Sequence, residues 1–269
     1  MANKDDGVIS LLAKCKYCWR WLATVFSFVL FGIGGILILS ILVPIFCLFS
    51  RDRVWRENRG QKLIHYSFRT FIWIMRFLGV LTYQVSGVEK LKKARLILAN
   101  HPSLLDAVFL IAFVPNACCI IKGDLIQNPF MRGAVKLAGY IVNKEDADEI
   151  INSAAEAFKN DYALIIFPEG TRTTPNCPTQ LKRGAANIAI RIGIDITPVI
   201  IKCNPTTLTK EDSWYLIPDQ CAHFQIKVND RIDVSQYLGA EHLTKSVREL
   251  TKDLSDYFNG KTLNQSINP

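Results

Sequence analysis

At 269 residues the chain is longer than one compact α/β domain needs, which leaves room for an extra segment at one end. Its net charge of +8 fits an anionic membrane surface, and no nucleic-acid-binding motif accompanies that charge, so a nucleic-acid partner is excluded. Eight scattered cysteines, with a single CxxC pair at Cys15 and Cys18 and no flanking histidine, predict reduced, mostly buried thiols and no metal site.

The extra segment is an uncharged stretch near the N-terminus. It follows a basic segment, residues 1–21, and residues 22–50 read LATVFSFVLFGIGGILILSILVPIFCLFS. As a helix this stretch would span about 43 Å, enough for a tilted crossing of a hydrocarbon core of about 30 Å. A signal peptide is disfavoured because its apolar core has about 7–15 residues. The glycines and Pro44 leave a re-entrant hairpin open beside a single crossing.

The next segment, residues 51–82, predicts a helix at the membrane surface. Lys62, Arg69 and Arg76 recur every seven positions, so on a helix they form one stripe beside aromatic and aliphatic side chains. Such a helix can place its charges at lipid phosphates and its rings among acyl chains, whereas a helix packed on the domain with solvated charges is the alternative. The positive-inside rule slightly favours a domain on the cytoplasmic face, and we predict the inner membrane of a bacterium.

Residues 83–260 predict one α/β domain, followed by a polar tail, residues 261–269. Short apolar runs alternate with amphipathic stretches, which indicates a mixed, largely parallel sheet flanked by helices. Strands are expected at residues 83–86, 96–99, 117–121, 140–143, 162–167, 196–203 and 224–228. Helices are expected at residues 104–114, 124–138, 147–159, 184–192 and 241–258. The pair Asn259-Gly260 is expected to end the last helix.

The stretch LILANHPSLLDAVFL, residues 96–110, places a histidine and an aspartate where a strand becomes a helix. On a continuous helix, five steps of about 100° would place His101 and Asp106 about 140° apart, on different faces. They can meet only if His101 lies in the turn before the helix. Pro102 and Ser103 provide that turn, with Ser103 as N-cap. A carboxylate on one ring nitrogen would fix the tautomer and leave the other nitrogen as a base. The alternative is a capping box, in which Asp106 reaches back to the helix start.

A second block, IIFPEGTRT at residues 165–173, ends a buried strand with residues suited to an anion. Gly170 allows close backbone approach, Thr171 offers a hydroxyl, and Arg172 offers a fork that matches a phosphate. Glu169 would repel a phosphate, so we expect it to orient Arg172 or to accept a hydrogen bond from a substrate hydroxyl. A surface loop with solvated charges is the alternative. Further cationic candidates follow this block: Lys182 and Arg183.

The two blocks, in this order and about sixty residues apart, resemble the glycerolphosphate and lysophospholipid acyltransferases. The resemblance extends over residues 83–228. Between the blocks, the segment IKGDL with Lys122 is similar to the family's lysine-containing segment. The apolar stretch at residues 196–203, with Pro198, resembles the family's last, proline-containing block.

The resemblance implies a membrane-bound O-acyltransferase of phospholipid biosynthesis, which moves an acyl group from a thioester to the hydroxyl of a lysophospholipid, first of all 1-acylglycerol-3-phosphate. It implies His101 as general base and Asp106 as its orienter. It also implies a substrate-binding group, in which Gly170, Thr171, Arg172 and Lys122 hold the acceptor phosphate and Glu169 supports that site. No metal or bound cofactor is implied, since the donor, acyl-CoA or acyl-carrier protein, is a substrate. The expected partners are membrane lipids, the donor and the acceptor.

One block departs from the family pattern. The family often has a glycine, apolar residues and then an acidic residue with an arginine, whereas residues 139–146 read GYIVNKED. Lys144 keeps a positive charge but lacks the guanidinium fork, so the acceptor, more than the reaction, is left open. Three alternatives remain: an acyltransferase for a specialised lipid acceptor, a lipid hydrolase, for which no Gly-x-Ser-x-Gly elbow is present, and a non-catalytic lipid-binding scaffold.

Overall fold

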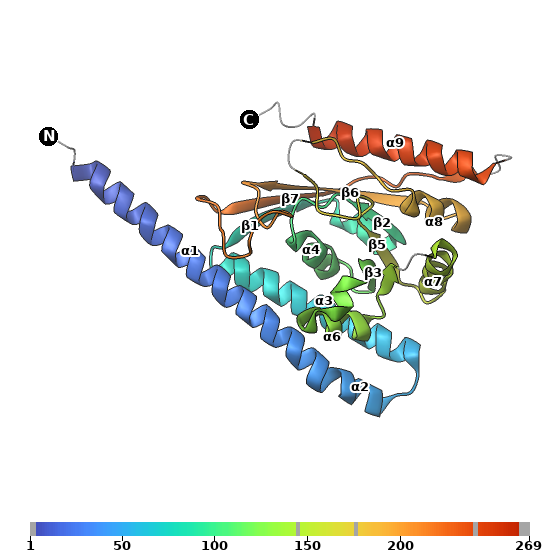
Figure 1. Cartoon of the computed structure of the whole chain (residues 1–269), viewed down its shortest axis with the longest axis horizontal. Helices are drawn as coiled ribbons and strands as arrows, with labels where there is room; N and C mark the ends of the chain where they lie inside the picture. Colours follow the sequence, from blue (N-terminus) through green and yellow to red (C-terminus); the bar gives the residue numbers. More distant parts are fainter. Residues whose placement is uncertain (1–3, 144–145, 175–176, 239–241, 264–269) are drawn as a thin grey trace.

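The computed structural model describes residues 4–143, 146–174, 177–238 and 242–263, and their strands form a mixed sheet between helical layers (Figure 1). The strands are β1 (Leu81–Ser86), β2 (Leu96–Ala99), β3 (Ala117–Lys122), β4 (Ile141–Asn143), β5 (Ala163–Ile166), β6 (Ile196–Asn204) and β7 (Ala222–Val228). Their order across the sheet is β1-β7-β6-β2-β5-β3-β4. The predicted fold class is confirmed, and each predicted strand is present with ends that differ by at most two residues.

The direction of the strands explains their hydrophobic patterns. From β6 to β4 all neighbours are parallel, whereas β7 runs antiparallel to β6 and parallel to β1. The central strands β2 and β5 are buried at every position, as their uninterrupted apolar sequences require of strands covered on both faces. In β7, buried and more exposed residues alternate, because one face of this side of the sheet is open.

The helices cover both faces of the sheet. The N-terminal helices are α1 (Lys4–Leu37), α2 (Val43–Phe49) and α3 (Arg53–Phe77). The others are α4 (Leu105–Phe113), α5 (Asp124–Gln127), α6 (Pro129–Ala138), α7 (Ala147–Lys159), α8 (Gly184–Ile192) and α9 (Leu243–Leu263). In Figure 1, α3 and α4 lie below the sheet, α9 lies above it, and α8 lies at its right-hand end, beside α9.

Two predicted helix boundaries were wrong. The helix expected at residues 124–138 is divided at Asn128, because Pro129 starts a new helix and the Asn128 side chain accepts a hydrogen bond from the Phe130 N–H at 2.9 Å. The last helix does not end at Asn259-Gly260 but continues to the end of α9. The Asn259 side chain bonds to the backbone of Thr179 and therefore holds this part of the helix against the domain.

The uncharged N-terminal stretch is one run of helix. A π-helical turn, Ile38–Leu42, joins α1 to α2, so the chain does not reverse direction within residues 22–50. Pro44 follows this turn and has no N–H to donate, which is a usual reason for a local change of helical pitch. Among the described residues, Leu12–Phe49 is the one helical run that is long and apolar enough to cross a membrane.

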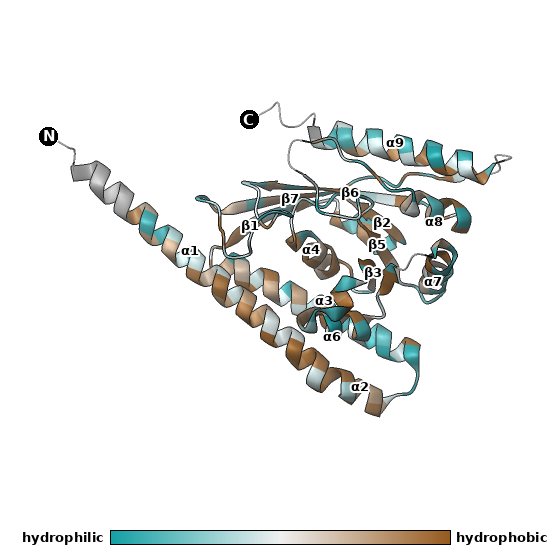
Figure 2. Cartoon of the chain, in the orientation of Figure 1, coloured by the Kyte–Doolittle hydropathy of each residue, from teal (hydrophilic) through white to brown (hydrophobic). Residues whose placement is uncertain are grey.

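This apolar helix lies lengthwise on the domain, with α3 running back beside it (Figure 1). One of its sides packs on α6, where a Cβ atom on Gly35 would overlap the carbonyl oxygen of Phe130. On the facing helix, a Cβ atom on Gly133 would lie 2.7 Å from the backbone nitrogen of Leu39. Glycine on both helices therefore permits a backbone approach that a side chain would prevent. Figure 2 shows this helix as mainly apolar, and its side chains away from the contact are exposed, among them Val29, Ile33 and Ile36.

The close contact predicts different responses of two adjacent glycines. Gly35→Ala should loosen the contact between α1 and α6 and lower the free energy of unfolding, because overpacking costs about 1–3 kcal/mol. Gly34→Ala is the matched control, since no atom lies within 4 Å of its added Cβ. Both variants gain the same helix propensity of about 1 kcal/mol, so the difference between their urea unfolding curves in detergent isolates the clash. Equal curves would contradict the close approach.

Candidate functional site

The site is built first on the contact between His101 and Asp106. His101 lies in the turn after β2, and Asp106 lies in the first turn of α4. The His101 Nδ1 atom is 2.9 Å from Asp106 Oδ2. Asp106 also accepts a hydrogen bond from the Ser103 N–H at 2.6 Å, so the carboxylate caps the helix and orients the ring at once. The sequence left open whether Asp106 orients His101 or caps the helix, and in the structure its carboxylate does both.

The predicted N-cap at Ser103 was wrong. Leu104 occupies the N-cap position without a side-chain hydrogen bond, and the Ser103 hydroxyl accepts only a long contact of 3.4 Å from the Leu105 N–H. The reason is tertiary: the Leu104 N–H donates to the carbonyl oxygen of Leu208 at 3.1 Å. The Leu208 carbonyl oxygen thus accepts a backbone hydrogen bond at the helix start, which a local N-cap side chain would otherwise accept.

The position of the ring fixes which nitrogen is available. An ionised Asp106 accepts the Nδ1 proton, so neutral His101 presents Nε2 as a hydrogen-bond acceptor. The ring stacks on Phe167 with centroids 4.1 Å apart, and the side chain stays 17% exposed. His101 is therefore held by its neighbours but can still be reached from outside.

Burial raises the pKa of Asp106, although the hydrogen bond and charge of His101, the Ser103 N–H and the charge of Arg172 act in the opposite direction. Its Oδ1 atom has no hydrogen-bond partner among the described residues. A buried carboxylate with so little compensation is stabilised most when the neighbouring ring is charged. Asp106 thus depends on the hydrogen bond from the His101 ring for part of its stabilisation.

Side chains of the second block, residues 165–173, form hydrogen bonds to the backbone of His101 in the first block. The His101 N–H lies 3.1 Å from Glu169 Oε1 and 3.0 Å from Thr173 Oγ1, while the Thr173 hydroxyl donates to Glu169 at 2.7 Å. The Thr173 N–H donates to the His101 carbonyl oxygen at 2.7 Å. Burial raises the pKa of the Glu169 carboxyl. Glu169 therefore contacts His101 rather than orienting Arg172, which corrects the first of the two expectations for it.

Thr173 was missed by the sequence reasoning. It ends the same IIFPEGTRT stretch, but Thr171 was chosen as the hydroxyl of interest, and Thr171 is exposed. A signal was present, because hydroxyl side chains near a strand-ending turn commonly bond to backbone groups. Which of the two hydroxyls faces the partner loop is decided only when β2 and β5 pair.

Arg172 is held by a segment that the sequence did not connect to it. Its Nη1 atom donates to the carbonyl oxygens of Leu208 at 2.9 Å and Thr209 at 2.6 Å. The guanidinium is therefore oriented by backbone through one nitrogen. Its remaining donors make no protein hydrogen bond within the described parts of the chain, and they are suited to an anion.

Gly170 and two lysines complete the predicted cationic group. Gly170 has a φ of 68°, and its missing side chain leaves room for Lys182, whose Nζ would lie 3.0 Å from a Cβ there. Lys122 ends β3 and is exposed, on the strand next to β5. In the paired strands Lys122 lies opposite Asn143. Lys144, the residue of the departing block, lies outside the described residues.

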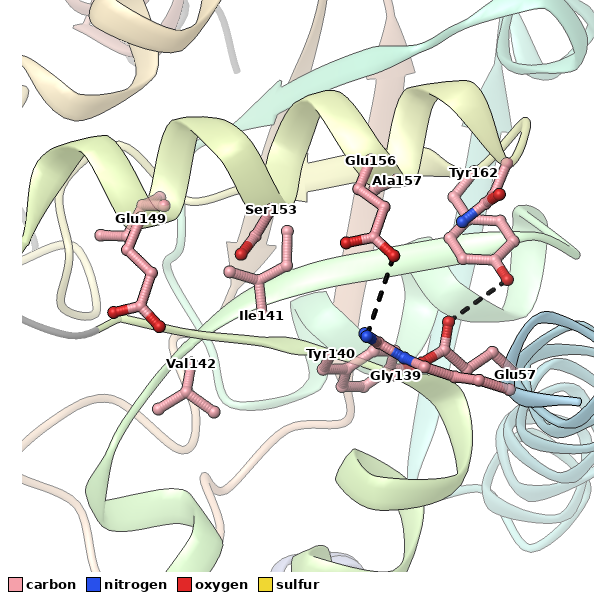
Figure 3. Close-up of a pocket in the computed structure, with 13 residues that line it drawn as sticks. Glu57, Gly139, Tyr140, Ile141, Val142, Glu149, Ser153, Glu156, Ala157 and Tyr162 are labelled. Carbon is pink, nitrogen blue, oxygen red and sulfur yellow. Dashed lines mark hydrogen bonds and ion pairs between the residues drawn. The ribbon is translucent and has the colours of Figure 1, made fainter. Parts of the chain in front are cut away.

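A separate cavity of about 210 Å³ contains none of the predicted site residues (Figure 3). It lies between α3, β4 and α7, and its lining includes Glu57, which bonds to Arg53 at 2.7 Å. Tyr140 and Tyr162, which line it, precede β4 and β5, so this cavity is at the amino ends of strands whose carboxyl ends carry the candidate site. Across the described ranges, no group of three or more His, Cys, Asp or Glu side chains could hold a metal ion.

Comparison with known proteins confirms the resemblance. Residues 82–202 match the family model described as Acyltransferase. A 1-acyl-sn-glycerol-3-phosphate acyltransferase of Saccharomyces cerevisiae is 34% identical over 149 residues, covering 52% of this chain and 49% of the relative. A protein of the same name from Helicobacter pylori is 36% identical over 114 residues, covering 40% and 48%. These matches span about half the length of the relatives.

One solved structure supports the fold. The crystal structure of the 1-acyl-sn-glycerophosphate acyltransferase PlsC from Thermotoga maritima superposes with a TM-score of 0.64. The superposition covers 90% of this chain and 97% of that chain, with 22% sequence identity. The likeness includes the N-terminal helices as well as the sheet, because the matched part exceeds the α/β domain.

The raised pKa of Asp106 predicts a pH-dependent effect of Asp106→Asn on stability. The folded state binds this proton more tightly than the unfolded state, so the wild type loses stability as pH rises from the ordinary pKa of 3.8 through the raised one. The variant lacks this loss and should gain on the wild type as pH rises above the ordinary carboxyl pKa of 3.8. Urea unfolding at several pH values measures the difference.

The control for this measurement has the opposite sign. Hydrogen bonds from Ser235 lower the pKa of the exposed Asp233, so its contribution is present above its ordinary pKa and is lost as pH falls. Asp233→Asn should therefore fall behind the wild type as pH rises. If Asp106→Asn changed with pH in the same direction as Asp233→Asn, the carboxylate of Asp106 would not be destabilised by its burial.

Proposed function

Residues 82–202 are an acyltransferase-family domain, and on that premise we propose that the chain is a membrane-bound O-acyltransferase that acylates a lysophospholipid hydroxyl from an acyl thioester. The first-choice acceptor is 1-acylglycerol-3-phosphate, the substrate in the names of the relatives. The observation that carries the proposal is the His101–Asp106 contact of 2.9 Å, clamped from behind by Glu169 and Thr173. It gives an accessible ring with a fixed tautomer beside a cationic group.

In the proposed reaction, Nε2 of His101 takes the proton of the acceptor hydroxyl as its oxygen attacks the thioester carbonyl carbon. Asp106 stabilises the imidazolium that forms, and general-base catalysis of this kind contributes about 10²–10⁴-fold. The C–S bond then breaks, the new ester remains on the acceptor, and the proton of His101 passes to the leaving thiolate. The step needs no metal or covalent enzyme intermediate.

The acceptor phosphate is proposed to bind Arg172, Lys122 and the loop of Gly170 and Thr171. Two or more cationic side chains match the charge of a phosphate monoester, and the Arg172 fork adds directional hydrogen bonds. Glu169 acts indirectly in this proposal: its carboxylate holds the His101 backbone while the cationic side chains hold the substrate. Lys182, beside Gly170, joins the same anion site.

The donor is proposed to be a substrate rather than a bound cofactor, either acyl-CoA or acyl-carrier protein. Both present the same thioester to His101, so the chemistry at the site is the same. A second acceptor class is favoured by one observation: Lys144 stands where the family often has an arginine. A specialised lyso-lipid with a different head group is therefore the alternative acceptor.

We propose five functional segments with the boundaries expected from the sequence: residues 1–21, 22–50, 51–82, 83–260 and 261–269.

The apolar helix is proposed to lie in the membrane surface rather than to cross it. Its packed side contacts α6, which carries the exposed Arg132 and Lys136. A perpendicular crossing would take these charges into hydrocarbon at a cost of about 2.5–3.5 kcal/mol each. The cytoplasmic face of a bacterial inner membrane is the proposed location.

The exposed side of α3 supports this attachment. Ile64, Phe68 and Met75 are buried against the domain, whereas the stripe of Lys62, Arg69 and Arg76 is exposed. Exposed rings lie beside these charges: Tyr66, Trp73 and Phe77. The helix therefore packs on the domain with one side and keeps the basic, aromatic side expected of an interfacial helix, so both sequence interpretations apply to it.

Transfer itself should depend on His101. With purified protein in detergent, an acyl thioester and a panel of lyso-lipids, His101→Ala should reduce product by about 10³-fold, because the general base is lost. His223→Ala is the matched control, since His223 bonds to Thr82 in the outer strands and should leave the rate unchanged. Products are identified by mass spectrometry, which also names the acceptor. Turnover retained by His101→Ala would exclude this residue as the base.

Vesicle binding should depend on the basic stripe of α3. Replacing Lys62, Arg69 and Arg76 by Gln should weaken binding to anionic vesicles by about 100-fold at low salt, since each cation contributes about 1 kcal/mol near such a surface. The control replaces the same number of exposed cations on α9: Lys245, Arg248 and Lys252. Equal losses in co-sedimentation for the two triple variants would contradict an interfacial α3.

A further inference from the structure

The connection between β6 and β7 is longer than its strands require. The two strands are direct antiparallel neighbours, which a tight hairpin of about 2–5 residues could join. Here the connection is residues 205–221, and in Figure 1 this orange segment reaches from the sheet to the long helix α1. A connection so much longer than a hairpin requires indicates that this loop has a function of its own.

The inner part of the connection is fixed to the candidate site. The Leu208 carbonyl oxygen accepts hydrogen bonds from Arg172 and from the N–H of Leu104 at the start of α4. Leu208 is buried at 5% exposure. The Thr209 N–H donates to the Asp212 carboxylate at 2.9 Å, which stabilises the turn. The base of the connection therefore moves with Arg172 and with the helix that carries Asp106.

The outer part exposes three consecutive apolar side chains. Trp214, Tyr215 and Leu216 are 46%, 48% and 57% exposed. Single exposed apolar residues are ordinary on protein surfaces, but an adjacent set with two aromatic rings marks a contact surface. The charged residues of the connection are Lys210, Glu211, Asp212 and Asp219, which sum to a negative charge. An anionic partner held by charge is thus disfavoured.

The exposed set continues the apolar surface of α1. The Trp214 ring lies 5.5 Å from that of Phe28, and Arg20 of α1 donates to the carbonyl oxygen of Asp219 at 2.5 Å. On the same stretch of α1, Leu22 and Phe26 are 57% and 55% exposed. Because residues 214–216 lie beside α1, a membrane that binds α1 would also contact these residues. Trp and Tyr, moreover, are the side chains that favour the membrane interface.

We propose that the connection of residues 205–221 is a separate membrane contact, in which Trp214, Tyr215 and Leu216 enter the interfacial region of the bilayer beside α1. The inference rests on the proposed function, since it assumes that α1 is at a membrane. It adds that the bilayer holds the segment whose carbonyl groups orient Arg172. The contact is apolar, so salt affects it much less than the basic stripe of α3.

The direct test places a reporter in the connection. In the full chain, Trp19, Trp21, Trp55 and Trp73 are changed to Phe, so that Trp214 is the remaining tryptophan of the five. With vesicles containing phospholipid brominated near the top of the acyl chains, we expect Trp214 fluorescence to fall at least twofold. Unchanged fluorescence of protein that floats with the vesicles would overturn the inference while leaving α1 attached. Protein that fails to float would overturn both this inference and the proposed membrane attachment.

A second test measures affinity without disturbing the Trp214–Phe28 contact. Tyr215→Ser with Leu216→Ser should weaken vesicle binding about tenfold at both low and high salt, because the lost contact is apolar. The control double variant changes exposed apolar residues elsewhere, Val88→Ser with Leu238→Ser, which are 43% and 42% exposed. Transfer to a short-chain, water-soluble acceptor in detergent should be unchanged in both. Wild-type affinity of the first variant, or an equal loss in both, would overturn the proposal.

Discussion

The buried carboxylate of Asp106 determines the geometry of the turn between β2 and α4. It accepts hydrogen bonds from the His101 ring and from the Ser103 N–H, with one oxygen still unpartnered among the described residues. Hydrogen bonds to a charged group contribute about 1.5–3 kcal/mol each, but the burial of the charge opposes them. The raised pKa of Asp106 indicates that burial is the larger effect. Burial of this carboxylate therefore lowers the stability of the fold, at the position where the proposed reaction needs a stabilised imidazolium.

The parallel pairing of β2 with β5 makes this turn rigid. Because both strands end at the same edge of the sheet, the loop after β5 can contact the turn after β2. Glu169 and Thr173 use that proximity to bond to the His101 backbone, and Asn100 bonds in both directions to the backbone of Ile201 in β6. The histidine is thus held from both neighbouring strands, and its ring position follows from the sheet.

The N-terminal helices and the β6–β7 connection relate this rigid site to the proposed membrane surface. Glycines at the α1–α6 contact bring the apolar helix against the domain, so its orientation is set by packing rather than by a flexible linker. The connection at residues 205–221 touches α1 at one end and Arg172 at the other. The proposed anion site is consequently fixed relative to the surface from which a lyso-lipid would arrive.

The sequence by itself determined the strands, most of the helices and the two blocks at the candidate site, because these depend on local periodicity and on turn residues. The apolar runs of β2 and β5 predicted buried parallel strands, and Pro102 predicted the turn that lets His101 meet Asp106. The tertiary structure alone decided which groups face each other across strands. Glu169 bonds to His101 instead of Arg172, Thr173 replaces Thr171 as the bonding hydroxyl, and Leu208 orients Arg172 from 36 residues away. Strand order and register bring these groups together, and no local pattern encodes them.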